Sequence, residues 1–303
     1  MGTMPRIVLF ALVSLFSLAL PAWGGGIAIV LSDRGSAYSD FSSALEDALS
    51  GTTWSISARH QADAIPPLAG QADIVVTVGS EALRKTLGRS DNPPILATLL
   101  PRQSYEKILA DVRRPGRVTA IYLDQPPARQ AAFIHHLLPG QKRAGMLLSN
   151  ETRTIPGLYR QAFTNAGLTL ESEDADTENT LLPALNSLLA RVNLLLAVPD
   201  SNIYHRNNIK PILITAFRYQ RPVIGYSPAF VNAGALAAIH STPAQIARQT
   251  ADTILMHGTS LPAPSAPTQF AIAINTNVAQ SLGLNIADEA TIRRAMGADR
   301  EAR

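Results

Sequence analysis

The sequence predicts an α/β protein made of two lobes of similar size, each built on a mostly parallel sheet. Two observations lead to this prediction. Short, strongly apolar runs alternate with amphipathic segments of helical period along the chain, a pattern typical of parallel strands covered by helices on both faces. The alternation breaks off near Pro126 and then starts again, which favours two sheets over one long sheet.

The first lobe is expected to begin with an apolar strand at residues 27–31 and a helix at 36–49. Phe41, Leu45 and Leu49 fall on one face of that helix, and Gly51 ends it. The remaining strands of this lobe are predicted at 53–58, 74–78, 95–99 and 118–123, with helices after Gly79-Ser80 and near 105–109.

The second lobe repeats the alternation, beginning with a helix at 126–138. Its strands are predicted at 145–148, 168–170, 194–198, 222–225 and 235–239, and its further helices at 159–166, 181–189 and 209–217. Residues 194–198 are strictly apolar, as expected of a strand that is buried on both faces.

The next helix carries clear start and stop signals. Thr242 is placed to cap it, Pro243 stands at its first position, Gln245 completes a capping box, and Gly258 ends it. A proline-rich connector at 261–267, a strand at 270–274 and a short helix at 278–282 are expected to follow, and then a charged tail.

The N-terminal residues have the order of a secretory signal peptide. Arg6 precedes an apolar run at 7–20, and Ala22 and Gly24 are the small residues required before a cleavage after Gly24. The run is too short for a membrane span, which needs about 20 residues. We therefore expect residues 1–24 to be removed on export to the periplasm, and not to act as a permanent anchor.

The composition excludes several kinds of site. The chain has no cysteine, so disulfides, thiolate metal sites, a thiol nucleophile and an acylated N-terminal cysteine are all excluded. The net charge of +3 comes from scattered residues without a basic run interleaved with aromatics, which argues against nucleic-acid binding. His135 and His136 are adjacent on a helix and cannot easily share a metal ion. No metal or cofactor is expected.

Two motifs resemble catalytic or phosphate-binding signatures. The glycines at 24–26 precede a strand, whereas a phosphate loop follows a strand and opens a helix, so we interpret them as cleavage-site context. Residues 225–229 resemble the nucleophile elbow of a serine esterase around Ser227, with Asp252 and His257 following in hydrolase order. Pro228 lacks the N–H that would complete the oxyanion hole, which disfavours this alternative.

Small and polar residues recur after the carboxyl ends of the predicted strands, where open parallel sheets bind ligands. The candidate ligand-binding residues are Ser32, Asp33, Gly79, Ser80, Thr98, Tyr122, Ser149, Asn150, Asp200, Ser201, Tyr226 and Ser227. Asp33 or Asp200 would hold an amine or another cationic group, and the hydroxyls of Ser80, Thr98, Ser149 and Ser227 would form hydrogen bonds to the ligand. Turns are rich in the same residue types, so no single position is evidence of a ligand site. The prediction rests on the recurrence of these residues at several strand ends.

Several segments together resemble a known family. They are residues 222–239 (PVIGYSPAFVNAGALAAI), 137–139 (LLP), 145–150 (GMLLSN), 198–200 (VPD), 273–275 (AIN) and 282–284 (LGL). They are similar to the periplasmic substrate-binding proteins of ABC importers, and more narrowly to the branch whose characterised members bind tryptophan or tyrosine.

The resemblance implies a type I periplasmic binding-protein fold, with two Rossmann-like lobes joined by a hinge of three crossovers. The N-terminal lobe would comprise residues 25–120 and 242–261, the C-terminal lobe 121–241 and 262–287, and the tail 288–303. Such a protein is not an enzyme. It is expected to be a monomer that closes on a small ligand and delivers it to an ABC permease in the inner membrane.

The sequence departs from the family pattern in ways that leave the ligand open. Asp200-Ser201 stands where the family usually has Asp-Asn, and His240-Ser241-Thr242 replaces the usual Asp-Tyr. The ligand could be an amino acid or another flat compound that stacks on aromatic rings. A sensory or partner-binding protein of the same fold that transports nothing is the principal functional alternative.

Overall fold

The first lobe is built on five parallel strands in the order β2-β1-β3-β4-β5. In the computed structural model, which describes residues 24–89 and 92–297, these strands are β1 (Gly25–Leu31), β2 (Trp54–Gln61), β3 (Ile74–Val78), β4 (Ile95–Leu100) and β5 (Val118–Tyr122). All five residues of β3 are buried, because helices cover both faces of the sheet.

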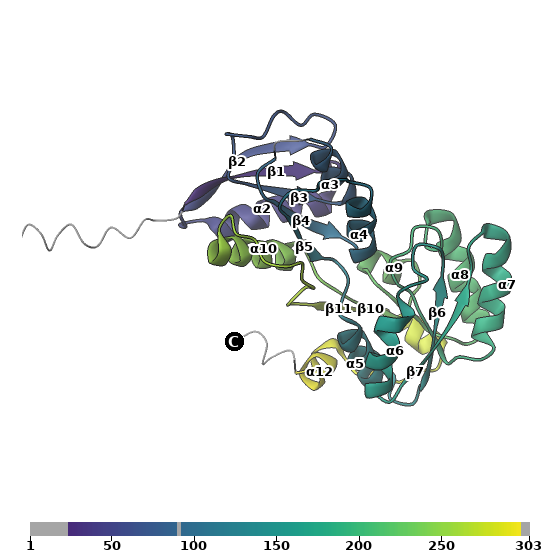
Figure 1. Ribbon diagram of the computed structural model, residues 1–303. Coiled ribbons are helices and arrows are strands. Elements are labelled where there is room, and N and C mark those ends of the chain that lie inside the picture. The colour runs from purple at the N-terminus through teal and green to yellow at the C-terminus, as the bar shows by residue number, and fades with distance from the viewer. Residues whose placement is uncertain (1–23, 90–91, 298–303) are drawn as a thin grey trace, which may run out of the picture.

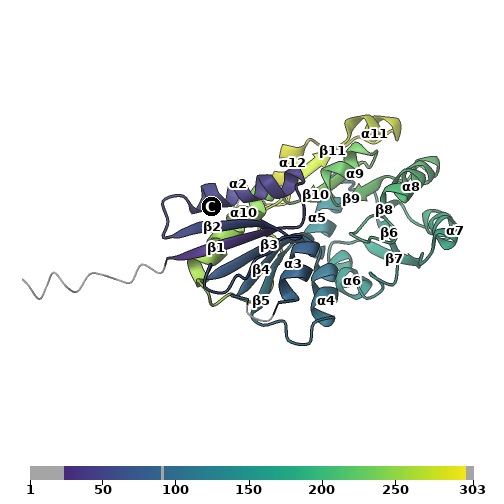
Figure 2. The ribbon, with the colours of Figure 1, turned by 90° about the horizontal axis from the view of Figure 1, so that it is seen from above.

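The helices of this lobe form one layer on each face of the sheet. Helices α2 (Ser36–Leu49) and α10 (Pro243–His257) pack together on one face, and α3 (Ser80–Leu87) and α4 (Arg102–Ala110) cover the other (Figure 2). Alternate residues of β1 therefore enter two separate cores, with Ile27 and Ile29 in one and Ala28 and Val30 in the other.

The second lobe is built on six strands in the order β11-β10-β9-β8-β6-β7 (Figure 2). They are β6 (Arg143–Leu148), β7 (Thr169–Asp174), β8 (Leu194–Leu196), β9 (Val223–Gly225), β10 (Ala237–His240) and β11 (Ala271–Ile274), of which β11 alone runs antiparallel to its neighbour. The edge strand β7 carries Glu171 and Glu173, which pair with Arg191; charges of this kind protect an exposed sheet edge.

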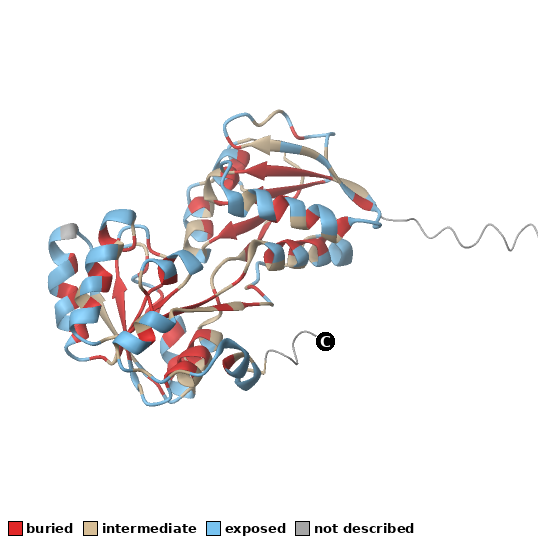
Figure 3. Ribbon diagram, turned by 180° about the vertical axis from the view of Figure 1, so that it is seen from behind, coloured by how far each residue is buried: buried red, intermediate tan, exposed pale blue. Residues whose placement is uncertain are grey.

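Helices also cover both faces of the second sheet. One face packs against α5 (Pro127–Leu137), α6 (Pro156–Asn165), α11 (Thr276–Ser281) and α12 (Glu289–Ala295), and the other against α7 (Glu178–Leu189), α8 (Arg206–Arg218) and α9 (Pro228–Asn232). Figure 3 shows the result in both lobes: the central strands are buried, and the outer faces of the helices are exposed. No helix among the described residues is both long and apolar enough to cross a membrane.

The chain passes between the lobes three times. It leaves the first lobe after β5, returns from β10 into α10, and leaves again between α10 and β11. Ser265 still belongs to the first lobe, because its N–H donates to the carbonyl of Ala120 and its carbonyl accepts from the N–H of Tyr122, both at 2.9 Å. The two crossings into the second lobe therefore lie after Tyr122 and after Ser265.

Three local expectations need correction. Residues 289–295, expected to belong to a charged tail, form α12. Its Ile292 is 1% exposed and packs into the hydrophobic core of the second lobe. Helix α9 was not predicted, since five residues are too few to show a helical period.

Gly25 and Gly26 open β1. A Cβ on Gly25 would come within 2.7 Å of the Trp54 ring, so close packing against Trp54 accounts for the glycine at this position. The predicted signal peptide, apart from Gly24, lies outside the described residues.

Candidate functional site

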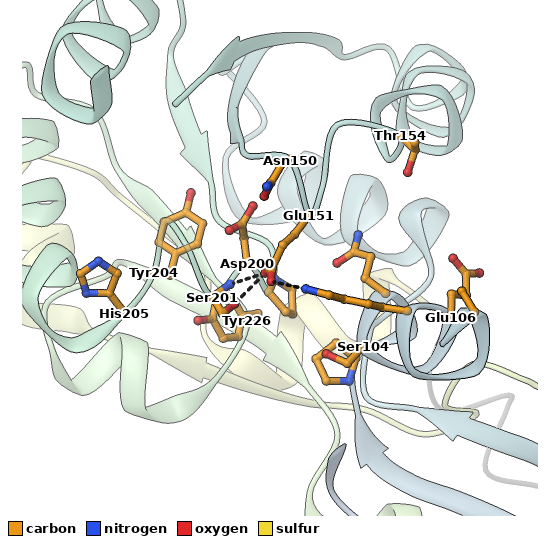
Figure 4. A pocket seen from close by; sticks show the side chains of 15 residues that line it. Ser104, Glu106, Asn150, Glu151, Thr154, Asp200, Ser201, Tyr204, His205 and Tyr226 are labelled. Carbon is orange, nitrogen blue, oxygen red and sulfur yellow. Dashed lines mark hydrogen bonds and ion pairs between the residues drawn. The ribbon is translucent and has the colours of Figure 1, made fainter. Parts of the chain in front are cut away.

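A cleft of about 790 Å³ lies between the two lobes (Figure 4). Helix α4 and the residue before it form its first-lobe wall, and the segments that follow β6, β8 and β9 form the second-lobe wall. The lining residues are Pro101, Gln103, Ser104, Glu106, Lys107, Ala110, Asn150, Glu151, Thr154, Pro199, Asp200, Ser201, Tyr204, His205 and Tyr226. Of the residues predicted from the sequence, this cleft brings together Asn150, Asp200, Ser201 and Tyr226.

Asp200 has a structural role at the base of the second-lobe wall. Its carboxylate is 5% exposed and accepts hydrogen bonds from the hydroxyls of Ser149 and Thr152, at 2.8 and 2.6 Å to one oxygen. The N–H groups of Ser149, Asn202 and Ile203 also donate to it, at 3.0–3.2 Å. These donors occupy the lone-pair sites of a carboxylate. Asp200 therefore ties the loop after β6 to the loop after β8. Its oxygens, expected from the sequence to hold a ligand amine, accept hydrogen bonds from the protein itself, and the Ser149 hydroxyl, expected to contact a ligand, is buried against them.

Glu151 is a carboxylate of the cleft that was not predicted from the sequence. Its Oε2 accepts hydrogen bonds from the N–H and the hydroxyl of Ser201, at 3.0 and 2.7 Å, and its Oε1 lies 3.4 Å from Nζ of Lys107 (Figure 4, dashed lines). Burial alone would raise the pKa of Glu151, but the hydrogen bonds from Ser201 and the charge of Lys107 outweigh it and lower the pKa. Glu151 is therefore a stable anion at the cleft, one position beyond the predicted pair Ser149-Asn150.

An aromatic cluster forms the apolar part of the same wall. The rings of Tyr204, Tyr226 and Phe230 pack in edge-on and tilted contacts with centroids 5.3–6.1 Å apart. Tyr204 and Phe230 are buried, whereas Tyr226 is partly exposed at the cleft. Burial, with a smaller contribution from Asp200, raises the pKa of Tyr226, so its hydroxyl stays protonated. Tyr226 thus offers the cleft a flat ring that its neighbours hold in place.

Ser227 acts as a helix cap. Its hydroxyl accepts a hydrogen bond from the N–H of Phe230 at 3.3 Å, and Pro228 occupies the first turn of α9. Asp252 and His257 lie on α10, which packs against α2 in the other lobe. The three residues of the esterase alternative are therefore not assembled into a triad.

Two of the first-lobe candidates lie at a different hollow. Ser32 and Asp33 line a pocket of about 500 Å³ beside β1, β2 and α3. The Ser32 hydroxyl accepts a hydrogen bond from the N–H of Ala82 at 2.9 Å, which satisfies a free donor at the start of α3, where Ser80 is the first residue. Gly79 has a φ of 91°, and a Cβ on it would lie 2.5 Å from the Ser32 hydroxyl, so this position requires glycine.

Asp33, Thr98 and Tyr122 are placed in three different ways. Asp33 is exposed and accepts a hydrogen bond from the N–H of Gly35 at 2.6 Å. Thr98 is fully buried and donates its hydroxyl to the carbonyl of Thr77, which corrects the expectation that it faces a ligand. Tyr122 is half-buried and packs edge-on against Tyr105, with ring centroids 5.7 Å apart.

Residues 61–296 match the family model described as ABC transporter substrate binding protein. No curated protein matches the chain. A conserved domain protein from Vibrio cholerae matches with a TM-score of 0.60 at 20% identity, over 88% of this chain and 97% of that one.

Two further solved structures are similar. An ABC domain in complex with L-Trp from Streptococcus pneumonia has a TM-score of 0.60 at 18% identity, over 89% of this chain and 98% of that one. The ligand-free, open structure of a substrate binding protein with adhesive properties from Clostridium difficile has a TM-score of 0.65 at 15% identity, over 87% and 96%. Similarity at these identities establishes a shared fold.

Proposed function

This chain belongs to the family of ABC transporter substrate-binding proteins, and we propose that it captures a small molecule between its lobes and delivers it to an ABC permease. Its fold is the type I periplasmic binding-protein fold expected from the sequence. The predicted signal peptide supports a periplasmic location for this step, and the proposal includes no covalent chemistry.

The interlobe cleft is the observation that carries the proposal. Its walls come from different lobes, and the lobes are joined by three chain crossovers. Rotation about such crossovers would bring α4 toward the loops after β6, β8 and β9 and would exclude water from a bound ligand. A cleft of about 790 Å³ falls within the range of 300–1,000 Å³ common for small-molecule sites.

The groups in the cleft suit an amino acid or another flat polar compound. Tyr226 offers a ring for stacking, and Lys107 and Glu151 offer charges of both signs. Asn150 and Ser104 add neutral polar groups from opposite walls. The L-Trp complex from Streptococcus pneumonia is a member of the same fold with a ligand of this kind.

A thermal-shift screen of the mature protein against amino acids, nucleosides, vitamins and sugars tests the proposal. A ligand present at 100 times its Kd should add about 2.7 kcal/mol to the free energy of unfolding. The Tyr226→Ala variant should lose most of the shift, whereas Tyr219→Ala, at the end of α8 and away from the cleft lining, should keep it. A ligand that shifts wild type and Tyr226→Ala equally would place the binding site elsewhere.

A further inference from the structure

A charged contact joins the two lobes across the cleft. Lys107 belongs to α4 in the first lobe, and its Nζ lies 3.4 Å from Oε1 of Glu151, in the segment after β6 of the second lobe. By contrast, the ion pairs of Arg59, Arg153 and Arg191 join residues within one lobe. The Lys107–Glu151 contact is therefore sensitive to the separation of the lobes.

The two partners are held to different degrees. The Glu151 side chain is 23% exposed, and two hydrogen bonds from Ser201 fix its Oε2, so its Oε1 is presented toward the first lobe. The Lys107 side chain is 70% exposed and reaches the carboxylate from the outside. The second lobe thus supplies a fixed anion, and the first lobe supplies a flexible cation.

Helix α4 connects this contact to the first crossover. The carboxylate of Asp124, just after β5, accepts a hydrogen bond from the N–H of Arg102 at 2.6 Å, at the start of α4. Lys107 lies later on the same helix. One end of α4 is therefore tied to the point where the chain leaves the first lobe, and the other touches the second lobe.

We propose that Lys107 and Glu151 are positioning residues that form an electrostatic latch, which favours the lobe separation of Figure 1 over wider and narrower ones. The significance of the latch for ligand capture rests on the proposed function, because affinity depends on the fraction of molecules in the binding-competent separation. The latch itself is a property of the ligand-free protein and is tested without a ligand.

The expected size of the effect follows from the exposure of the pair. Exposed ion pairs contribute little to folding, but a balance between lobe separations responds to small energies. A contribution typical of such pairs changes the ratio of two separations about two- to fivefold. Salt should weaken the latch, because the screening length falls from about 30 Å at 0.01 M to about 3 Å at 1 M.

The absence of cysteine makes the measurement direct. Cysteines introduced at the exposed Ser43 on α2 and Asn186 on α7 would be unique labelling sites, one on each lobe. Single-molecule energy transfer between two dyes at these sites reports the distribution of lobe separations. The wild-type mature protein is compared at low and high NaCl with Lys107→Gln, Lys107→Arg and Glu151→Gln. The control is Asp176→Asn, which removes one of the two acidic partners of Arg153 inside the second lobe.

We expect the wild-type distribution to broaden with salt, and Lys107→Gln to show the broad distribution already at low salt. Lys107→Arg and Asp176→Asn should behave like the wild type. An identical distribution for wild type and Lys107→Gln at low salt would overturn the latch, as would an equal change in Asp176→Asn. A protein that binds no ligand in the thermal-shift screen could still show the latch, so the two proposals fail separately.

Discussion

The side-chain amide of Gln125 donates a hydrogen bond to the hydroxyl of Ser241 at 2.8 Å, although 116 residues separate them in the sequence. The Ser241 hydroxyl in turn donates to the carbonyl of Gln269 at 2.5 Å. Each of the three residues lies in a different crossover between the lobes. This chain of hydrogen bonds therefore fastens the three crossovers to one another.

Arg129 reinforces the same region. Its guanidinium donates to the Gln125 side chain at 2.9 Å and to the carbonyls of Pro267 and Thr268 at 2.8 and 3.0 Å. It also lies 5.1 Å from the centroid of the Phe270 ring. The crossovers thus share a polar network, and lobe motion must take place around it.

The network predicts that Ser241→Ala is destabilising. The variant leaves the buried Gln125 amide and the Gln269 carbonyl without their shared partner, which should lower the free energy of unfolding by about 1–3 kcal/mol. Urea denaturation of the mature protein measures the loss. Ser260→Ala, at an exposed position after α10, is the matched control and should change little. Equal stability of wild type and Ser241→Ala would show that the network contributes nothing to the fold.

Because the Asp200 carboxylate accepts hydrogen bonds from two loops, Asp200→Asn should lower the free energy of unfolding markedly. The amide would present N–H donors to a site already filled with donors from Ser149, Thr152 and the backbone, at a cost of about 2–3 kcal/mol. Asp33→Asn, which changes an exposed carboxylate with one backbone partner, should cost less than about 1 kcal/mol. Chemical denaturation distinguishes the two variants, and similar losses for both would contradict the assignment.

The sequence predicts much of the fold because the fold follows from local patterns. The apolar run at 74–78 coincides with β3, and the capping box of Thr242 and Gln245 is present at the start of α10, with the Gln245 N–H donating to the Thr242 hydroxyl at 3.2 Å. Helix α12 was not predicted, because a single buried residue, Ile292, does not give a charged segment a recognisable apolar period.

The site is harder to predict because its decisive contacts join residues far apart in the chain. The strand-end rule found the loops after β6, β8 and β9 but not which side chains are already engaged. The Ser149 hydroxyl donates a hydrogen bond to Asp200, 51 residues away. The Ser32 hydroxyl accepts one from the N–H of Ala82, 50 residues away. The hydrogen bonds between the crossovers were not predicted for the same reason, since no local pattern marks Gln125 as a partner of Ser241.

Helix α8 ends in a conformation that glycine would stabilise. Gln220 has a φ of 56°, the N–H of Arg221 donates to the carbonyl of Ala216, and the N–H of Gln220 donates to the carbonyl of Phe217. A side chain with a Cβ costs about 1–2 kcal/mol in this left-handed region. Gln220→Gly should therefore raise the free energy of unfolding by about 1 kcal/mol, whereas Gln220→Ala, which keeps the Cβ, should not. A Gln220→Gly protein less stable than Gln220→Ala in urea would contradict this reasoning.

His240, at the end of β10 before the crossover to α10, predicts a dependence of stability on pH. Its Nδ1 is buried without a hydrogen-bond partner among the described residues. Burial lowers the pKa of His240, and Glu289 on α12 offsets only part of this effect. The folded protein therefore binds a proton at this site less readily than the unfolded chain, whose histidines titrate near pH 6.5.

The sign of the effect follows from this difference. The stability that neutral His240 contributes is fully present above about pH 6.5 and is lost as the pH falls toward the lower pKa of the folded state. Between pH 7 and pH 5, the melting temperature of His240→Gln should consequently fall less than that of the wild type. His257→Gln, at an exposed position on α10, should follow the wild-type curve. Parallel curves for wild type and His240→Gln would show that this histidine is not protonated at a cost to the fold.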